Sequence, residues 1–207
     1  MYMQQDIYKT VEEVGEGTIT ERKSKFIAYI HPVATEEEVK ELLEEHRKKY
    51  YNARHICWAY MLGPLREEFR ANDDGEPSGT AGRPILGQIN SFELTDVLIL
   101  VIRYFGGTLL GTGGLIKAYR EAATAAIESV TIVEKTIDDT IRIYFEYPLL
   151  NEVMRILNMY EEATWVQHFT ETCEMVITIR QSQSEQLAQA LSKIYGVEVK
   201  REEKQED

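Results

Sequence analysis

A glycine-rich segment is the strongest sign of chemistry in this sequence. Residues 101–120 read VIRYFGGTLLGTGGLIKAYR, where an apolar run leads through five glycines into a helical pattern. Glycines let backbone N–H groups approach a ligand, and the N-terminus of a helix adds partial positive charge. Three cations of the same segment, Arg103, Lys117 and Arg120, add to that charge. The segment therefore predicts a site for an anion, and for phosphate in particular.

The same glycines also have a purely structural interpretation, in which they let a tight loop pack against a sheet. Gly106 and Gly111 have the spacing of a phosphate-binding P-loop, but Thr112 stands where that motif requires lysine. The dinucleotide pattern G-x-G-x-x-G is also missing. An anion site and a structural loop are therefore weighed about equally.

A second candidate is the polar stretch at residues 73–82, DDGEPSGTAG, because binding residues are often carried on loops. Its acids do not have the spacing of a calcium loop, and G-x-S-x-G is not met around Ser78. The stretch is interpreted as a solvated turn or a binding loop. Its candidate residues are Asp73, Asp74, Gly75, Glu76, Ser78, Gly79 and Thr80.

Histidine and cysteine give weaker signals. His55, next to Arg54, is a possible proton donor or anion contact, although a lone histidine at a strand start is more often structural. The four histidines have no metal-ligand spacing and no C-x-x-C occurs, so neither a metal nor a cofactor is expected. Cys57 and Cys173 are expected to be reduced, buried thiols.

The elements that must position these candidates follow from the spacing of apolar residues. In the first part of the chain, strands are predicted at 24–31, 55–62, 67–72 and 96–105, and helices at 36–51 and 115–129. Thr35 and Glu38 form a predicted capping box for the first helix. Residues 73–87, with four glycines and two prolines, are predicted to be loop throughout.

The second part of the chain follows a different pattern. Strands are predicted at 139–146, 163–170, 174–180 and 197–200, with one helix after Pro148 and another capped by Ser182 or Ser184. This β-α-β-β-α-β order is typical of the ferredoxin-like fold, the split βαβ arrangement. The sequence thus predicts an α+β protein with two domains, residues 1–133 and 134–207.

Charge and hydropathy limit the class of protein. The 207 residues carry a formal net charge of −12, which argues against coating nucleic acid with the whole surface. Cations are locally concentrated, however, with five and no acid between Arg47 and Arg66. No apolar run approaches the roughly 20 residues of a membrane span, and residues 1–6 are polar. We therefore expect a cytoplasmic protein without a membrane partner.

Four stretches together resemble the YigZ/IMPACT family. They are SKFIA at 24–28, ARHICWAY at 53–60, DDGEPSGTAGRPIL at 73–86 and IRYFGGTLLGTGGLIKAYREAA at 102–123. The resemblance implies a first domain similar to the second domain of ribosomal protein S-five, and a ferredoxin-like second domain. Because eukaryotic members regulate translation through a protein partner, and nucleic-acid or ribosome binding is proposed for bacterial members, it also implies a role in translation.

The resulting expectation is a translation-associated regulator that binds RNA, the ribosome or another anionic partner through a glycine-rich basic face. An enzyme acting on a small phosphorylated metabolite and a protein-interaction module are the alternatives, and no catalytic residue is assigned. The predicted anion-binding residues are Lys25, Arg54, His55, Arg83, Arg103, Gly106, Gly107, Gly111, Gly113, Gly114, Lys117 and Arg120.

Overall fold

The computed structural model describes residues 6–169 and 172–201. They form two compact units, of which the first comprises residues 8–135 and the second the described residues of 1–7 and 136–207. Asp6 and Ile7 thus group with the second unit, whereas the sequence placed them in the first domain. Both units combine helices with strands, as predicted.

The first unit is built on a five-stranded antiparallel sheet. Its strands, in spatial order, are β2 (Gly15–Glu21), β3 (Ser24–Pro32), β6 (Val97–Tyr104), β4 (His55–Leu62) and β5 (Glu68–Asn72). A separate two-stranded sheet joins β1 (Ile7–Val11) and β7 (Ile132–Thr136). Strands β1, β2 and β7 were not predicted from the sequence.

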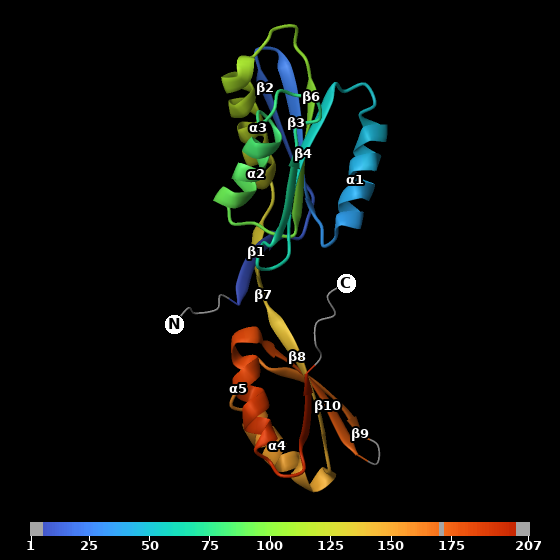
Figure 1. Cartoon of the computed structure of the whole chain (residues 1–207), viewed down its shortest axis with the longest axis vertical. Coiled ribbons are helices and arrows are strands. Elements are labelled where there is room, and N and C mark those ends of the chain that lie inside the picture. The colour runs from blue at the N-terminus through green and yellow to red at the C-terminus, as the bar shows by residue number, and fades with distance from the viewer. Residues whose placement is uncertain (1–5, 170–171, 202–207) are drawn as a thin grey trace. The chain divides into compact units, whose positions relative to one another are not determined.

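Helices cover both faces of the five-stranded sheet (Figure 1). Helix α1 (Glu36–Lys49) lies on one face, and helices α2 (Gly82–Ser91) and α3 (Gly111–Ile127) lie on the other. Residues 97–102 of β6 are fully buried, because alternate side chains enter the cores on the two faces. The continuous apolar pattern of this strand is thereby explained, as the sequence predicted.

Helix α1 confirms the predicted cap with one change. The Glu38 N–H donates to Thr35 Oγ1 at 3.2 Å, as in a capping box. The Glu38 carboxylate accepts from the backbone N–H of Ala34, at 2.6 Å, rather than from that of Thr35. The helix still gains two satisfied donors at its start.

Helix α2 corrects the prediction that residues 73–87 are loop throughout. Pro84 stands in the first turn of α2, where its missing N–H costs nothing, and Ile85 and Ile89 are completely buried. The glycines and prolines hid this helical spacing from the sequence pattern. Helix α3 similarly begins at Gly111 instead of Leu115, so three of the loop glycines belong to its first turn.

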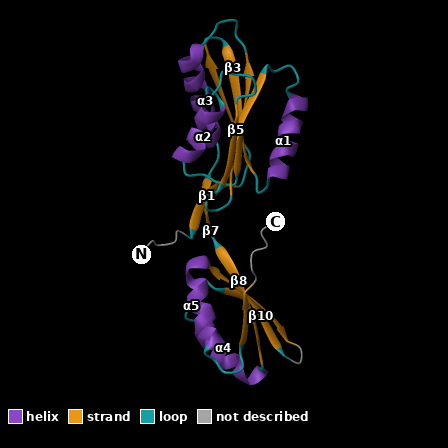
Figure 2. Ribbon diagram, in the orientation of Figure 1, coloured by secondary structure: helices purple, strands orange, loops and turns teal. Residues whose placement is uncertain are grey.

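The second unit has one four-stranded antiparallel sheet, in the order β11-β8-β10-β9, with two helices packed on it (Figure 2). The chain order is β-α-β-β-α-β, as predicted, and Thr170, the predicted end of the second of these strands, lies outside the described residues. This order begins with β8 (Asp138–Phe145), a 3-10 turn (Tyr147–Leu149) and α4 (Leu150–Leu157). The elements that follow are β9 (Thr164–Phe169), β10 (Cys173–Arg180), α5 (Gln181–Ser192) and β11 (Glu198–Arg201).

The start of α5 departs from the prediction. Neither Ser182 nor Ser184 caps the helix, whose N-cap residue is Arg180 and carries no capping side chain. Instead the carboxylate of Asp6 accepts the Ser182 backbone N–H at 3.0 Å and also binds the Ser182 hydroxyl. An acid from the N-terminal segment thus supplies the cap that a local serine was expected to supply.

Both cysteines, Cys57 and Cys173, are free and buried, as expected. Among the described residues, no helix combines the length and the apolar character that crossing a membrane requires.

Candidate functional site

A cavity of about 470 Å³ lies where β4 begins and β6 ends. Its walls come from Arg54 and His55, from residues 75–77, from Arg103, and from the segment 105–115 that leads into α3. In the sheet, His55 pairs with Arg103 across β4 and β6. We call this hollow the β4–α3 cavity. It joins parts of all three segments that the sequence singled out.

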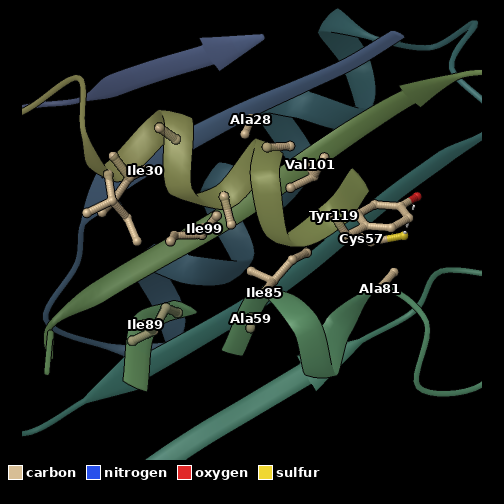
Figure 3. Packing of buried hydrophobic residues seen from close by; sticks show 14 of the residues in the cluster. Ala28, Ile30, Cys57, Ala59, Ala81, Ile85, Ile89, Ile99, Val101 and Tyr119 are labelled. Atoms are coloured by element: carbon tan, nitrogen blue, oxygen red, sulfur yellow. Dashed lines mark hydrogen bonds between the residues drawn. The ribbon is translucent and has the colours of Figure 1, made fainter. Parts of the chain in front are cut away.

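A buried network of polar side chains forms one wall of the cavity and continues into the core. Arg103 Nη1 donates to Glu76 Oε1 at 2.5 Å, and the Tyr119 hydroxyl donates to the same oxygen at 2.9 Å. The Cys57 thiol donates to that hydroxyl at 3.3 Å. Figure 3 shows the two side chains next to each other. Burial raises the pKa of both Cys57 and Tyr119. The thiol therefore stays protonated, which excludes it as a nucleophile near neutral pH.

Arg103 corrects the expected basic face. Its side chain is 8% exposed and that of Glu76 is 3% exposed, so the two charges neutralise each other out of contact with bulk water. The guanidinium also lies 5.5 Å and 5.8 Å from the ring centres of Phe26 and Phe105. Arg103 therefore offers its charge inside the cavity and not to a large surface partner.

His55 and Asp74 tie the 73–82 loop to the sheet. His55 Nδ1 lies 2.7 Å from the backbone oxygen of Asp74, which can only accept, so Nδ1 carries the proton. The Asp74 carboxylate accepts from the Ile56 N–H at 2.7 Å and from Arg47 at 3.0 Å. The structural interpretation of His55 thus has a defined contact, and its Nε2 is the ring nitrogen left for a ligand.

Asp73 organises the loop from within. Its carboxylate accepts the backbone N–H groups of Gly79, Ala81 and Gly82 at 2.7, 3.0 and 2.8 Å. Burial alone raises the pKa of Asp73, but these three bonds outweigh it and lower the pKa below its usual value. Asp73 thereby holds the start of α2.

The other loop residues also have placed roles. Thr80 is buried and donates to the Pro77 oxygen at 2.6 Å, whereas Ser78 is exposed. Gly75 and Gly79 have φ angles of +85° and +75°, which favour glycine. Of the loop candidates, Gly75 and Glu76 are the ones that line the cavity.

The glycines before and within α3 serve different purposes. A Cβ on Gly106 would lie 2.1 Å from the backbone carbon of Lys23, so this glycine allows close packing against β3. Gly107 and Gly111 have φ angles of +86° and +70°. Gly113 meets neither constraint, because nothing lies within 4 Å of its added Cβ, and at Gly114 the nearest atom is Leu110 Cβ at 3.1 Å. The structural interpretation therefore accounts for Gly106, Gly107 and Gly111, while the anion site stays a prediction.

The remaining predicted cations are dispersed over the first unit. Lys25 alternates with Phe26 on β3 and so points to the α1 face of the sheet, opposite His55 and Arg103. Arg83 is exposed in the first turn of α2. Lys117 pairs with Glu121 at 3.7 Å on the exposed side of α3, where Arg120 also lies. Lys25 is therefore not on the face that carries His55 and Arg103, whereas Arg83, Lys117 and Arg120 belong to the two helices that cover that face.

Apolar residues of the cavity were missed by the sequence analysis. Phe105 and Leu109 line it, yet their side chains are 44% and 82% exposed. Pro77, Leu110 and Leu115 complete its apolar wall. The available signal was the pair of leucines inside a glycine-rich loop, a place where apolar side chains have no core to fill. In residues 6–169 and 172–201, no cluster of three or more metal-ligating side chains is present.

The segments that build this cavity also carry the similarity to known proteins. Residues 22–127 match the family model described as the Impact N-terminal domain. The chain belongs to the IMPACT family. This confirms the resemblance that the four sequence stretches indicated.

Relatives in the IMPACT family match most of this chain. The IMPACT family member YvyE of Bacillus subtilis is 33% identical over 187 residues, which cover 90% of this chain and 86% of the relative. The IMPACT family member YigZ of Escherichia coli is 36% identical over 138 residues, or 66% of this chain and 68% of the relative. A crystal structure of a hypothetical protein covers 97% of this chain and 99% of its own, with a TM-score of 0.69 and 25% identity.

Proposed function

We propose that this IMPACT family member acts in the control of translation by binding a protein partner at the rim of the β4–α3 cavity. The observation that carries the proposal is the exposure of Phe105 and Leu109 on that rim. Large apolar side chains exposed beside a concave site are typical of protein interaction surfaces. The role in translation is taken from the family to which the chain belongs.

A protein partner is favoured over RNA because several of the predicted cations are not free to bind a large surface partner. Arg103 is buried beside Glu76 and out of reach of such a partner, Lys117 pairs with Glu121, and Lys25 lies on the other face of the sheet. RNA binding draws most of its affinity from several phosphate contacts made together. A chain with a formal net charge of −12 and dispersed cations is poorly suited to that.

In-cell crosslinking tests this proposal. A photoreactive amino acid replaces exposed Leu109 and, in a matched control chain, exposed Leu65, which lies outside the cavity lining. We expect position 109, and not position 65, to capture a protein of the translation machinery identified by mass spectrometry. Crosslinking of position 109 to RNA, including ribosomal RNA, in place of a protein would show that the RNA alternative is correct and the protein partner is not. The same partners at both positions would refute the site.

We also propose a specific fold type for each of the two units. We assign the first unit to the type of the second domain of ribosomal protein S-five, and the second to the ferredoxin-like type. The β-α-β-β-α-β order and the strand order β11-β8-β10-β9 support the second assignment. A cytoplasmic location accompanies a role in translation, and fractionation of cells expressing a tagged chain tests it.

A further inference from the structure

The β4–α3 cavity has the size and wall composition of a small-ligand site. Its volume of about 470 Å³ falls within the range of roughly 300–1,000 Å³ common for such sites. Phe105, Leu110 and Leu115 form an apolar wall, and a few polar groups converge on the same space. This distribution requires a ligand that is partly apolar and partly polar.

The polar end of the cavity includes the N-terminus of a helix. The start of α3, at Gly111 and Thr112, lines the cavity, and the helix has neither a capping side chain nor an acid in its first turn. The first four N–H groups of a helix have no partner within the helix and favour an anion. The 17 residues of α3 give this end its full dipole.

Arg103 gives an independent indication of a missing ligand. Its side chain is more than nine-tenths buried and lines the cavity, and Nη1 is bound to Glu76. Its Nε has no hydrogen-bond partner among the residues that the structure describes. A buried donor without an acceptor is costly, and the same guanidinium lines the cavity, where its N–H groups not bound to Glu76 can donate to a ligand oxygen.

The charged residues that line the cavity are two arginines, Arg54 and Arg103, and one acid, Glu76, so their formal charges favour an anion. Glu76 is the acid in its wall, but Glu76 accepts bonds from both Arg103 and Tyr119 and is neutralised by the first. Exposed Arg54 then adds positive charge at the mouth, whereas His55, with its proton on Nδ1 toward the Asp74 carbonyl, adds none. The wall around these groups is apolar, which strengthens their attraction for an anion.

We propose that the β4–α3 cavity binds a small phosphate monoester whose body is apolar. The phosphate lies between the N-terminus of α3, Arg103 and Arg54, and the body packs on Phe105, Leu109 and Leu110. Phosphate is favoured over carboxylate because its three terminal oxygens match donors that converge from several directions. The inference does not rest on the role in translation, since it concerns the isolated chain.

Calorimetric titration of the full chain with phenyl phosphate, inorganic phosphate and benzoate tests the ligand class. We expect phenyl phosphate to bind at least about tenfold more tightly than either of the others, because inorganic phosphate has no apolar body and benzoate offers a planar two-oxygen carboxylate in place of three phosphate oxygens. Equal affinity for phenyl phosphate and inorganic phosphate would refute the apolar subsite. Equal or tighter binding of benzoate would refute the choice of phosphate, and no binding of phenyl phosphate would refute the site.

Two variants and a matched control locate the ligand. Arg54→Ala is expected to weaken phenyl phosphate about tenfold, as for loss of one charge-assisted hydrogen bond, while Lys25→Ala removes the same charge on the other face and changes affinity less than about twofold. Leu109→Ser is expected to weaken phenyl phosphate without affecting inorganic phosphate. Equal effects of Arg54→Ala and Lys25→Ala would overturn the assignment, and unchanged melting temperatures exclude unfolding as a cause.

The two proposals can fail separately. Loss of phenyl phosphate binding leaves the crosslinks from position 109 unaffected, because that experiment reads the rim of the cavity and a macromolecular partner. Absence of a protein crosslink likewise leaves the calorimetric result intact.

Discussion

At the scale of single residues, the pair of Arg103 and Glu76 decides how the site is interpreted. Twenty-seven positions separate the two side chains, and they meet only because the 73–82 loop folds over the end of β6. The sequence indicated both residues as candidates, but nothing in local spacing indicates that they neutralise each other. The partner of a charged side chain is a tertiary property, which explains why the basic face was overestimated.

Breaking this pair is expected to be strongly destabilising. Arg103→Met leaves the Glu76 carboxylate buried without its cation, which costs about 3–5 kcal/mol of unfolding free energy. Urea denaturation measures the loss. Lys117→Met, which removes an exposed pair with Glu121, is the control and should change stability by less than about 1 kcal/mol. The double variant Glu76→Leu with Arg103→Met should recover part of the loss, and failure to do so would contradict the ion-pair explanation.

His31 makes the stability of the chain depend on pH. Burial lowers the pKa of His31 to about 4, with the positive charge of His46 adding to the effect. Between pH 6.5 and pH 4 the unfolded chain binds a proton that the folded chain excludes, so stability falls as the pH falls. From pH 7.5 to pH 5.0 the expected loss is about 2 kcal/mol.

Denaturation of the wild type and of His31→Phe at both pH values measures this loss. The phenylalanine variant cannot titrate at this position and should lose correspondingly less stability. Equal losses in the two proteins would assign the pH dependence to other groups.

At the scale of elements, the sequence predicted those whose spacing is regular and missed those interrupted by glycine. Helix α1 and strands β3, β4 and β6 have long apolar patterns and were found. Strand β2 contains Gly15 and Gly17, where an added Cβ would lie 2.8 Å and 2.5 Å from backbone atoms of α3. These glycines allow the helix to approach the strand closely, and they also erase the alternation by which a strand is recognised.

Asp73 is expected to control the stability of α2 and its preceding loop. Asp73→Ala removes the acceptor for three backbone N–H groups and should cost about 2 kcal/mol, because a lost N-cap alone costs 0.5–2. Ser78→Ala, at an exposed position of the same loop, is the control with an expected change below about 0.5 kcal/mol. Thermal unfolding followed by circular dichroism compares them, and equal stability of the two variants would refute the role of Asp73.

Two glycines near α3 should respond to alanine in opposite directions. Gly106→Ala forces a Cβ against the Lys23 backbone at 2.1 Å and should destabilise the first unit by more than about 2 kcal/mol. Gly113→Ala meets open space within a helix and should stabilise it by about 0.5–1 kcal/mol. Urea midpoints measure both. A destabilised Gly113→Ala would mean that this glycine has a structural task the geometry does not reveal.

At the scale of the whole molecule, the chain is divided differently in space and in sequence. The second unit includes Asp6 and Ile7 as well as residues from 136 onward. The first unit consists of the residues between these two parts, 8–135. Composition changes near residue 132 indicated where one unit ends, but no pattern in the polar N-terminal residues indicated that they serve the second unit. The bond between Asp6 and Ser182 joins residues 176 positions apart, and such a contact produces no periodic pattern in the sequence from which it could be predicted.

Removing that carboxylate should loosen α5 selectively. Asp6→Ala leaves the Ser182 N–H and the first turn of the helix without their cap, at a cost of about 1 kcal/mol. Hydrogen exchange followed by mass spectrometry should show faster exchange in the peptide that begins α5 and no change in α1. Glu13→Ala, at an exposed acid of the N-terminal region, is the matched control. Uniform protection in both variants would show that Asp6 is dispensable.

The bond between Asp6 and Ser182 also sets an order of events during synthesis. Because Asp6 precedes Ser182 by 176 positions, a nascent chain exposes Asp6 on the ribosome long before Ser182 is made. The first unit can fold once residue 135 has left the ribosomal exit tunnel, but Asp6 cannot form its bond until Ser182 has left it as well. Asp6 therefore reaches its native partner only after the whole first unit has been synthesised.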